Sequence, residues 1–296
     1  MAEFDYIAWL RSRTPPASRV AIGPGDDTAA LIPPTRELLV TTDMLMDGTD
    51  FVLADVGGRR VGRKAMAVNL SDIAAMAGVP IAAVVSVALP PASRQLAEEL
   101  YLGLRDMADA FGVPIVGGDT NSWGGPLVIS VTAMGEATER GPVRRSGARP
   151  GDWLFVTGPL GGSILGHHLD FTPRVREAIA LHEAVPLHAL IDISDGLAAD
   201  LNHILEESGC GAVLTADAIP ITDAARELSR TSGKTPLQHA LGDGEDFELV
   251  FAVSPEDGAK LVAGSPVPVW KIGECVASGL WLGGAPLAPT GWVHSM

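Results

Sequence analysis

Short apolar runs and longer stretches with helical spacing alternate along the whole chain. Runs rich in β-branched residues predict strands at residues 38–42, 81–89, 113–116, 127–134, 153–157 and 247–253. The clearest helical patterns cover residues 61–77, 93–111 and 197–207, and the first ends at a glycine with a proline beyond it. This order of elements predicts a mixed α/β protein.

A polar stretch near the middle of the chain interrupts this pattern. Residues 135–152 are rich in Gly, Pro and Arg, and a new strand pattern starts directly after them. A chain of 296 residues also exceeds the size at which one hydrophobic core usually suffices. We therefore predict two α/β domains, residues 1–138 and residues 139–296.

Composition and charge restrict the classes of ligand. Hydrophobic residues make up 47% of the chain and charged residues 19%, as in a packed globular protein, and the formal net charge is −15. This charge disfavours nucleic acid and anionic membrane surfaces as partners. A chain of this charge that binds phosphorylated ligands needs cations between the two, and divalent metal ions held by clustered carboxylates supply them.

The cysteines and the N-terminal residues indicate the cellular compartment of the protein. Cys210 and Cys275 have neither CxxC nor Cys/His spacing, which argues against a disulfide framework or a zinc site. Residues 1–10 contain Glu3 and Asp5 and lack the basic and apolar regions of a signal peptide. We therefore expect a cytoplasmic protein.

Aspartates recur beside glycine or hydroxyl residues at the ends of apolar runs. The segments concerned are 25–27, 41–43, 69–72, 117–120 and 192–196. Strand ends converge on one edge of a sheet, where α/β folds build ligand sites. We therefore expect Asp43 and Asp119 to face one ion from neighbouring loops.

Asp72 also has a structural interpretation. It falls in a predicted apolar helix, where a carboxylate is costly to bury unless it is paired or metal-bound. Metal binding is the better explanation, and a buried salt bridge with Arg63 or Lys64 is its rival. The pattern leaves both open.

Three further segments have both a functional and a structural explanation. The glycine-rich residues 158–163 can present backbone N–H groups to phosphate, but tight packing of a turn explains the glycines equally well. Ser194 or Asp195 can bind a ligand or cap the helix that follows. Arg144 and Arg145, at the predicted domain junction, are the best-placed cations for phosphate, although linker arginines are more often solvated.

Nucleophilic catalysis finds no support in the spacing. No Ser/His/Asp or Cys/His set can be assembled, so we predict neither a covalent nucleophile nor a general base. Reasoning from the residues ends at an α/β enzyme that handles phosphate with several metal ions.

Seven segments, in this order, resemble the thiamine-monophosphate kinase family, part of an ATP-binding superfamily with aminoimidazole ribonucleotide synthase and selenophosphate synthetase. They are GDDTA (25–29), TTDMLMDGTDF (41–51), KAMAVNLSDIAAMAG (64–78), VGGDT (116–120), RSGARPGD (145–152), DISDGLAADL (192–201) and GDGEDFEL (242–249). The resemblance runs nearly end to end. It implies magnesium-dependent, direct in-line transfer of the γ-phosphate of ATP to thiamine monophosphate, in thiamine diphosphate biosynthesis.

The resemblance also implies a site, carried over residue by residue. The implied magnesium ligands are Asp27, Thr41, Thr42, Asp43, Asp72, Asp119, Asp192 and Asp195. The implied nucleotide contacts are Tyr101, Gly118, Asp119, Arg145 and Ser194, and the implied thiamine phosphate contacts are Asp50, Glu245 and Trp292. The implied assembly is a homodimer in which the N-terminal sheets of two subunits pair into a barrel, with the active site in a cleft near that interface.

The sequence departs from the family pattern at three places. Asp50 stands where many members have His, Asp243 stands in a segment that is usually GGED, and the stretch between residues 158 and 192 is shorter than usual. The first two departures bear on substrate recognition rather than on the metals.

Other readings are weaker. Selenophosphate synthetase needs a cysteine or selenocysteine in an N-terminal loop, and no cysteine precedes Cys210. The hydrogenase-maturation relative needs a C-terminal cysteine, whereas this chain ends in Ser295 and Met296. Aminoimidazole ribonucleotide synthase shares the fold, but residues 41–51 and 244–249 resemble the kinase more closely. From another class, a non-catalytic nucleotide- or metal-binding regulator is the alternative.

Overall fold

The computed structural model describes residues 9–14, 16–23 and 28–292. The chain divides into two compact units, one of residues 1–73 and 79–137 and the other of residues 74–78 and 138–296. Each unit combines a sheet with helices, so the prediction of a mixed α/β protein is confirmed.

The first unit is built on a four-stranded sheet. Its strand order is β3 (Leu38–Met46), β6 (Val128–Glu136), β4 (Val79–Leu89) and β5 (Ile115–Ser122). The first three strands are antiparallel, and β4 and β5 are parallel. A parallel pair needs a crossover connection, which α4 (Arg94–Ala110) supplies here. A separate pair, β1 (Val20–Ile22) and β2 (Ala30–Leu31), precedes this sheet in the chain.

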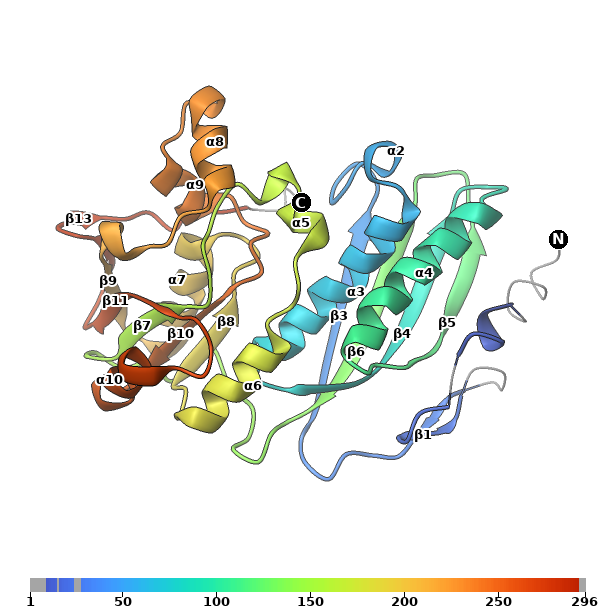
Figure 1. Ribbon diagram of the computed structural model, residues 1–296, viewed down its shortest axis with the longest axis horizontal. Helices are drawn as coiled ribbons and strands as arrows, with labels where there is room; N and C mark the ends of the chain where they lie inside the picture. The colour runs from blue at the N-terminus through green and yellow to red at the C-terminus, as the bar shows by residue number, and fades with distance from the viewer. Residues whose placement is uncertain (1–8, 15, 24–27, 293–296) are drawn as a thin grey trace. The chain divides into compact units, whose positions relative to one another are not determined.

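Two long helices, α3 (Gly58–Ala74) and α4, cover one face of this sheet (Figure 1). Glycines let them approach closely. A Cβ atom at Gly62 would lie 2.1 Å from the Leu100 carbonyl oxygen, and one at Gly103 would lie 1.9 Å from the Arg59 carbonyl oxygen. A short helix, α2 (Leu53–Val56), leads from β3 into α3.

The opposite face of the sheet is open within the chain and is apolar along β3. Successive residues of a strand point to opposite faces, so the even-numbered residues of β3 point away from the helices. Leu38, Val40, Met44 and Met46 lie at these positions and are 39% to 61% exposed. This apolar sheet face therefore has no cover among the described residues.

The second unit contains a seven-stranded sheet. Its order is β13 (Ala285–Pro286), β12 (Leu280–Leu282), β9 (Gly211–Leu214), β11 (Trp270–Val276), β7 (Trp153–Val156), β10 (Leu249–Val253) and β8 (Ala189–Asp192). Neighbouring strands are antiparallel except for β12 and β9. Its helical elements are η1 (Ser163–Leu165), α5 (His167–Asp170), α6 (Val175–Ala184), α7 (Leu197–Ser208), η2 (Ala216–Ala218), α8 (Asp223–Ser232), α9 (Pro236–Gly242) and α10 (Pro255–Gly264).

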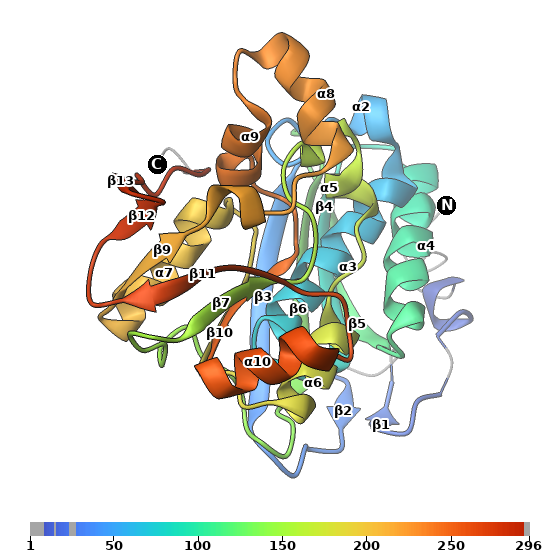
Figure 2. The same cartoon turned by 60° about the vertical axis from the view of Figure 1, so that its left-hand side comes forward.

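Strands β7 and β10 lie side by side in the middle of this sheet (Figure 2), and alternate residues of each point to opposite faces. Leu154 and Val250 belong to a buried cluster that also contains residues of α7 and α9. On the other side, the rings of Phe155 and Phe251 stack at 5.5 Å. Helix α10 packs there, because a Cβ atom at Gly258 would lie 2.6 Å from the Trp153 ring.

The predicted strands and helices all occur, with ends shifted by up to six residues. The largest shift is in β5, predicted at 113–116 and observed at 115–122. The sequence pattern did not single out the short strands β8, β9, β11, β12 and β13 of the second unit. Among the helices of the described residues, none has both the length and the apolar character that a membrane crossing requires.

Candidate active site

The first cluster of predicted ligands lies between β3 and α3. The hydroxyl of Thr41 donates to the Asp72 carboxylate, and the backbone N–H of Asp43 donates to Asn69 Oδ1 at 3.1 Å. Asn69 is itself oriented by a hydrogen bond to the Ala65 carbonyl at 3.0 Å. Asp72 is half-buried rather than buried. The cluster presents hydroxyl and carboxylate oxygens, which are the ligands that Mg²⁺ prefers.

Lys64 and Asp50 shape the turn that follows β3. The Lys64 ammonium is 1% exposed, and it donates to the backbone carbonyl of Asp50 at 2.8 Å. The Asp50 carboxylate accepts the Met46 N–H at 2.7 Å. Asp50 therefore has a structural role in this turn. Its contact with thiamine phosphate stays a prediction.

Thr42 and Asp119 point to the opposite face of the sheet from Asp43. The Thr42 hydroxyl accepts from Thr132 at 3.0 Å, and strand register places the exposed Asp119 beside Ser86 on this same face. Strands β3 and β5 are the two edges of the sheet, three spacings of about 4.8 Å or about 14 Å apart. The expectation that Asp43 and Asp119 face one ion from neighbouring loops is therefore wrong within one chain.

The neighbour of Asp119 must be glycine. A Cβ atom at Gly118 would lie 1.8 Å from the carbonyl oxygen of Val85 on β4. Any side chain would separate the parallel strands at this point. Asp27, the remaining predicted ligand of this unit, lies outside the described residues.

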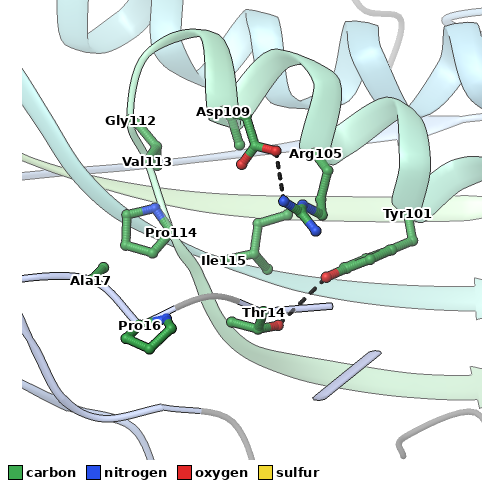
Figure 3. A pocket seen from close by; sticks show the side chains of 11 residues that line it. Thr14, Pro16, Ala17, Tyr101, Arg105, Asp109, Gly112, Val113, Pro114 and Ile115 are labelled. Carbon is green, nitrogen blue, oxygen red and sulfur yellow. Dashed lines mark hydrogen bonds and ion pairs between the residues drawn. The ribbon is translucent and has the colours of Figure 1, made fainter. Parts of the chain in front are cut away.

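A cavity of about 410 Å³ lies beside Tyr101 in the first unit (Figure 3). The Tyr101 hydroxyl lies 3.4 Å from Thr14 Oγ1, and Arg105 donates to Asp109 at 2.7 Å on the same wall. Ile115, Pro16 and Ala17 are among the apolar residues of the lining. The lining thus combines apolar and polar groups, and the nucleotide contact at Tyr101 stays a prediction.

In the second unit, one end of the sheet brings together residues that are distant in sequence. Asp192, the last residue of β8, pairs in register with Leu249, the first residue of β10. The loops beside these residues therefore lie side by side. The Glu245 N–H donates to the Ser194 carbonyl at 2.7 Å, and the Trp292 N–H donates to the Asp195 carbonyl at 2.9 Å. Four predicted site residues thus converge.

Asp200 belongs to this site and was not among the predicted residues. Its Oδ2 accepts the N–H groups of Asp195 at 2.9 Å and of Gly196 at 3.0 Å. Oxygen and nitrogen atoms of Asp195, Asp200 and His203 lie within 4.8 Å of one another, which is close enough to hold one ion. The signals in the sequence were its place within the family segment 192–201 and its position four residues after Gly196, on the predicted helix that follows.

The capping interpretation of Ser194 and Asp195 is wrong. Helix α7 has Gly196 as its N-cap, with φ 121°, and no side chain caps it there. A Cβ atom at Gly196 would lie 2.9 Å from the Cα atom of Gly242, so only glycine lets the two loops meet. Asp200, in the first turns of the helix, instead accepts the N–H groups of Asp195 and Gly196, which precede the helix.

Negative charge is crowded in this unit. Burial, reinforced by the Asp192 carboxylate, raises the pKa of Asp200 to about 7. Burial also raises the pKa of Asp246 well above its usual range, with Glu248 and Asp243 adding to the effect. A divalent cation would relieve this repulsion, so the donor set fits Mg²⁺.

The metal-free protein should lose stability as pH rises from about 4 to about 7. In this window the unfolded Asp200 carboxyl ionises while the folded one, with its raised pKa of about 7, keeps its proton, so the free energy of unfolding falls. Thermal melting in EDTA across this range measures the slope. Asp200→Asn should flatten the slope and the exposed Asp217→Asn should not. Equal slopes in all three proteins would contradict the assignment.

The interpretation of residues 158–163 as a phosphate cradle is wrong. The Gly161 N–H donates to both oxygens of Asp246, at 2.8 and 3.0 Å, and the Gly162 N–H donates to Asp243 at 3.0 Å. The protein's own carboxylates therefore occupy these groups. Tight packing explains the glycines, since a Cβ atom at Gly161 would lie 2.6 Å from the backbone nitrogen of Ala240.

A hydrogen-bonded Ser/His/Asp chain does exist, although spacing did not predict one. His239 is 2% exposed, with Nε2 2.7 Å from Ser232 Oγ and Nδ1 2.7 Å from Asp243. It links the end of α8 to the end of α9. Because the Asp243 carboxylate also accepts the Gly162 N–H, we interpret the chain as a brace and keep the prediction of no nucleophile.

The predicted phosphate-binding arginines lie on the segment that leads into β7. Arg145 is exposed, and its carbonyl accepts the Ser208 hydroxyl at 3.3 Å. The Arg144 carbonyl accepts the Leu190 N–H at 3.0 Å. The backbone is thus fixed beside β8, and the Arg145 side chain stays at the surface.

Comparisons with known proteins agree with this arrangement. Residues 25–137 match the family described as AIR synthase related protein, N-terminal domain, and residues 149–280 match its C-terminal domain. A thiamine-monophosphate kinase of Rhodopirellula baltica is 42% identical over 99% of this chain and 97% of its own.

Two solved structures are similar over nearly the whole chain. The thiamine-monophosphate kinase of Stenotrophomonas maltophilia K279a has a TM-score of 0.84 and 34% identity, covering 97% of this chain and 98% of its own. The structure of AaThiL complexed with AMPPCP and TMP has a TM-score of 0.80 and 29% identity, covering 99% and 96%.

Proposed function

The chain belongs to the thiamine-monophosphate kinase family, and we propose that it transfers the γ-phosphate of ATP to the phosphate of thiamine monophosphate, giving thiamine diphosphate and ADP. The observation that carries this proposal is the convergence of Ser194, Asp195, Glu245 and Trp292 at one end of the second sheet. The complex of AaThiL with AMPPCP, an ATP analogue, and TMP supports the same pair of substrates.

In this proposal the two domains have different roles. Residues 1–138 bind ATP and magnesium and form the dimer, and residues 139–296 complete the nucleotide and thiamine phosphate site. Asp43 and Asp72 in the first unit, and Asp192 and Asp195 in the second, would hold Mg²⁺. When bound, Mg²⁺ neutralises phosphate charge and aligns the reacting groups.

The chemistry needs little from the protein beyond position and charge. The acceptor oxygen belongs to a phosphate that is already largely ionised near neutral pH, with a second pKa of about 6, so no strong general base is required. Glu245 and Trp292 would hold thiamine phosphate, and the 57% exposed Trp292 indole can stack on the thiamine ring. Ser194 and Arg145 would hold the nucleotide. No phosphoenzyme forms in this scheme.

The test is to incubate the purified protein with ATP, Mg²⁺ and thiamine monophosphate and to quantify thiamine diphosphate and ADP. We expect equimolar products that disappear with EDTA. Consumption of ATP without thiamine diphosphate would move the substrate to another member of the superfamily. No consumption of ATP with any acceptor would favour the non-catalytic regulator.

The apolar sheet face, Leu38, Val40, Met44 and Met46, supports a homodimer. These side chains are exposed in the single chain, and a second copy would bury them against the same face. In this proposal the two sheets pair into a barrel, which also places the open-face residues Thr42 and Asp119 inside the assembly.

Val40→Lys should therefore give a monomer. A lysine on the apolar sheet face would place an unpaired charge in the buried interface. The dimer affinity should fall by at least about tenfold, which corresponds to a loss of about 1.4 kcal/mol in the free energy of association. Light scattering after gel filtration measures the mass. Val262→Lys, at a 66% exposed position of α10, should leave the wild-type mass unchanged. A monomeric wild-type protein would contradict the dimer.

A further inference from the structure

The loop between α9 and β10 has an unusual backbone. Gly244, Glu245 and Phe247 have φ angles of 74°, 53° and 49°, all in the left-handed region. Glutamate and phenylalanine adopt this region at a cost in free energy, so contacts elsewhere must hold them there. Part of this support is visible at Phe247, whose ring stacks on Phe171 at 4.0 Å.

Asp243 supplies the support at the start of the loop. Its side chain is only 11% exposed, and it accepts from Gly162 N–H at 3.0 Å and from His239 Nδ1 at 2.7 Å. The Lys234 ammonium lies 3.5 Å away. One carboxylate thus ties the loop to the glycine turn, to α9 and to the segment between α8 and α9.

The groups that Asp243 contacts are themselves fixed. His239 is held on its other side by Ser232, and Thr235 and Gln238 form a capping box at the start of α9. The glycine turn has no room to move, because a Cβ atom at Gly162 would lie 2.4 Å from the Ala225 backbone nitrogen. A carboxylate that is hydrogen-bonded to rigid partners holds its own backbone in a fixed position relative to them.

Asp246 repeats the arrangement on the far side of Glu245. Both of its oxygens accept the Gly161 N–H, so two consecutive N–H groups of the glycine turn bind the two carboxylates that flank Gly244 and Glu245. Glu245 is held between these two attachments. Its own N–H then donates to the Ser194 carbonyl at 2.7 Å.

We infer that Asp243 is a positioning residue for the substrate: it holds Glu245 in the left-handed conformation from which its carboxylate reaches thiamine monophosphate. The inference rests on the proposed function, since Glu245 is a proposed contact of that substrate. Asp243 itself touches no substrate in this scheme. Its loss should weaken binding of thiamine monophosphate more than binding of ATP, because Glu245 lies in this loop, whereas the proposed nucleotide contact Ser194 meets the loop only through its backbone carbonyl in the bond from the Glu245 N–H.

The test measures KM for each substrate separately in Asp243→Ala and Asp243→Asn. For Asp243→Ala we expect KM for thiamine monophosphate to rise about tenfold and KM for ATP to change by less than about twofold. The asparagine oxygen can still accept the Gly162 N–H, so Asp243→Asn should lie between the wild type and Asp243→Ala. This variant also serves if the alanine variant fails to fold.

The matched control is Asp257→Asn, which removes a carboxylate that pairs with Lys260 at 2.8 Å on α10. It should leave both KM values unchanged. Equal changes in the two KM values, or a loss of active protein with wild-type KM values, would overturn the positioning role. A wild-type protein that forms no thiamine diphosphate would overturn the proposed function and this inference together, so the two failures are distinguishable.

Discussion

Asp72→Asn will abolish phosphoryl transfer while leaving the fold intact, with kcat/KM falling by about a hundredfold or more. Removing one ligand charge from a magnesium site withdraws several kcal/mol of transition-state stabilisation, and about 1.4 kcal/mol corresponds to each factor of ten in rate. The asparagine oxygen can still accept the Thr41 hydroxyl, so the contact between α3 and β3 survives. The free energy of unfolding should change by less than about 1 kcal/mol.

The measurement is the initial rate of thiamine diphosphate formation, together with thermal melting. Asp106→Asn is the matched control, because Asp106 is an exposed carboxylate of the same unit that pairs with Arg59 at 2.7 Å. It makes the same change in charge and should alter the rate by less than about twofold. Unchanged turnover in Asp72→Asn would count against Asp72 as a magnesium ligand.

Glu248→Ala will produce the largest loss of stability among the substitutions considered. Glu248 is 3% exposed, accepts the Thr157 hydroxyl at 2.6 Å, and pairs with Arg174 through Nε at 2.8 Å and through a second, shorter contact. Removing it leaves the Arg174 guanidinium without its main partner in a largely buried place. Losses of about 3–5 kcal/mol are typical, and the 29% exposure of Arg174 reduces the expected value to about 2–4 kcal/mol.

Thermal melting should then shift downward by about 5–10 °C for the transition of the second unit. Glu256→Ala removes an 84% exposed carboxylate that lies 3.2 Å from Lys260, and an exposed pair of this kind contributes at most about 1 kcal/mol. A shift of equal size in both variants would show that the Glu248–Arg174 pair stabilises the fold no more than an exposed pair does. A shift in Glu248→Ala alone would support the larger contribution of the buried pair.

Sequence patterns predicted the main helices and strands and several of the residues at the site. The long helices and the apolar strands follow from local periodicity, which acts over a few residues and needs no partner. Asp72 could be placed on a helix for the same reason, whereas the short strand that ends at Asp192 was not predicted. The family resemblance supplied Glu245 and Trp292, which no local pattern marks.

Tertiary structure decided which of these residues meet. Asp43 and Asp119 both belong to strands, but strand order puts them at opposite edges and on opposite faces of one sheet, and periodicity says nothing about order. The glycines at 161 and 162 suggested a phosphate cradle until their N–H groups were seen to bind Asp246 and Asp243. Those partners lie more than eighty residues away.

By itself, then, the sequence determined the mixed α/β character, the two-domain organisation and the family, because these depend on local spacing and on many short motifs in order. The sequence marked Asp243 only as a departure from the family pattern, and only the tertiary structure showed what Asp200 and Asp243 contact. Their importance comes from hydrogen bonds to backbone groups, which every residue carries and which therefore leave no mark in the sequence. The pKa of Asp200 was equally inaccessible, since burial and the nearby Asp192 set it.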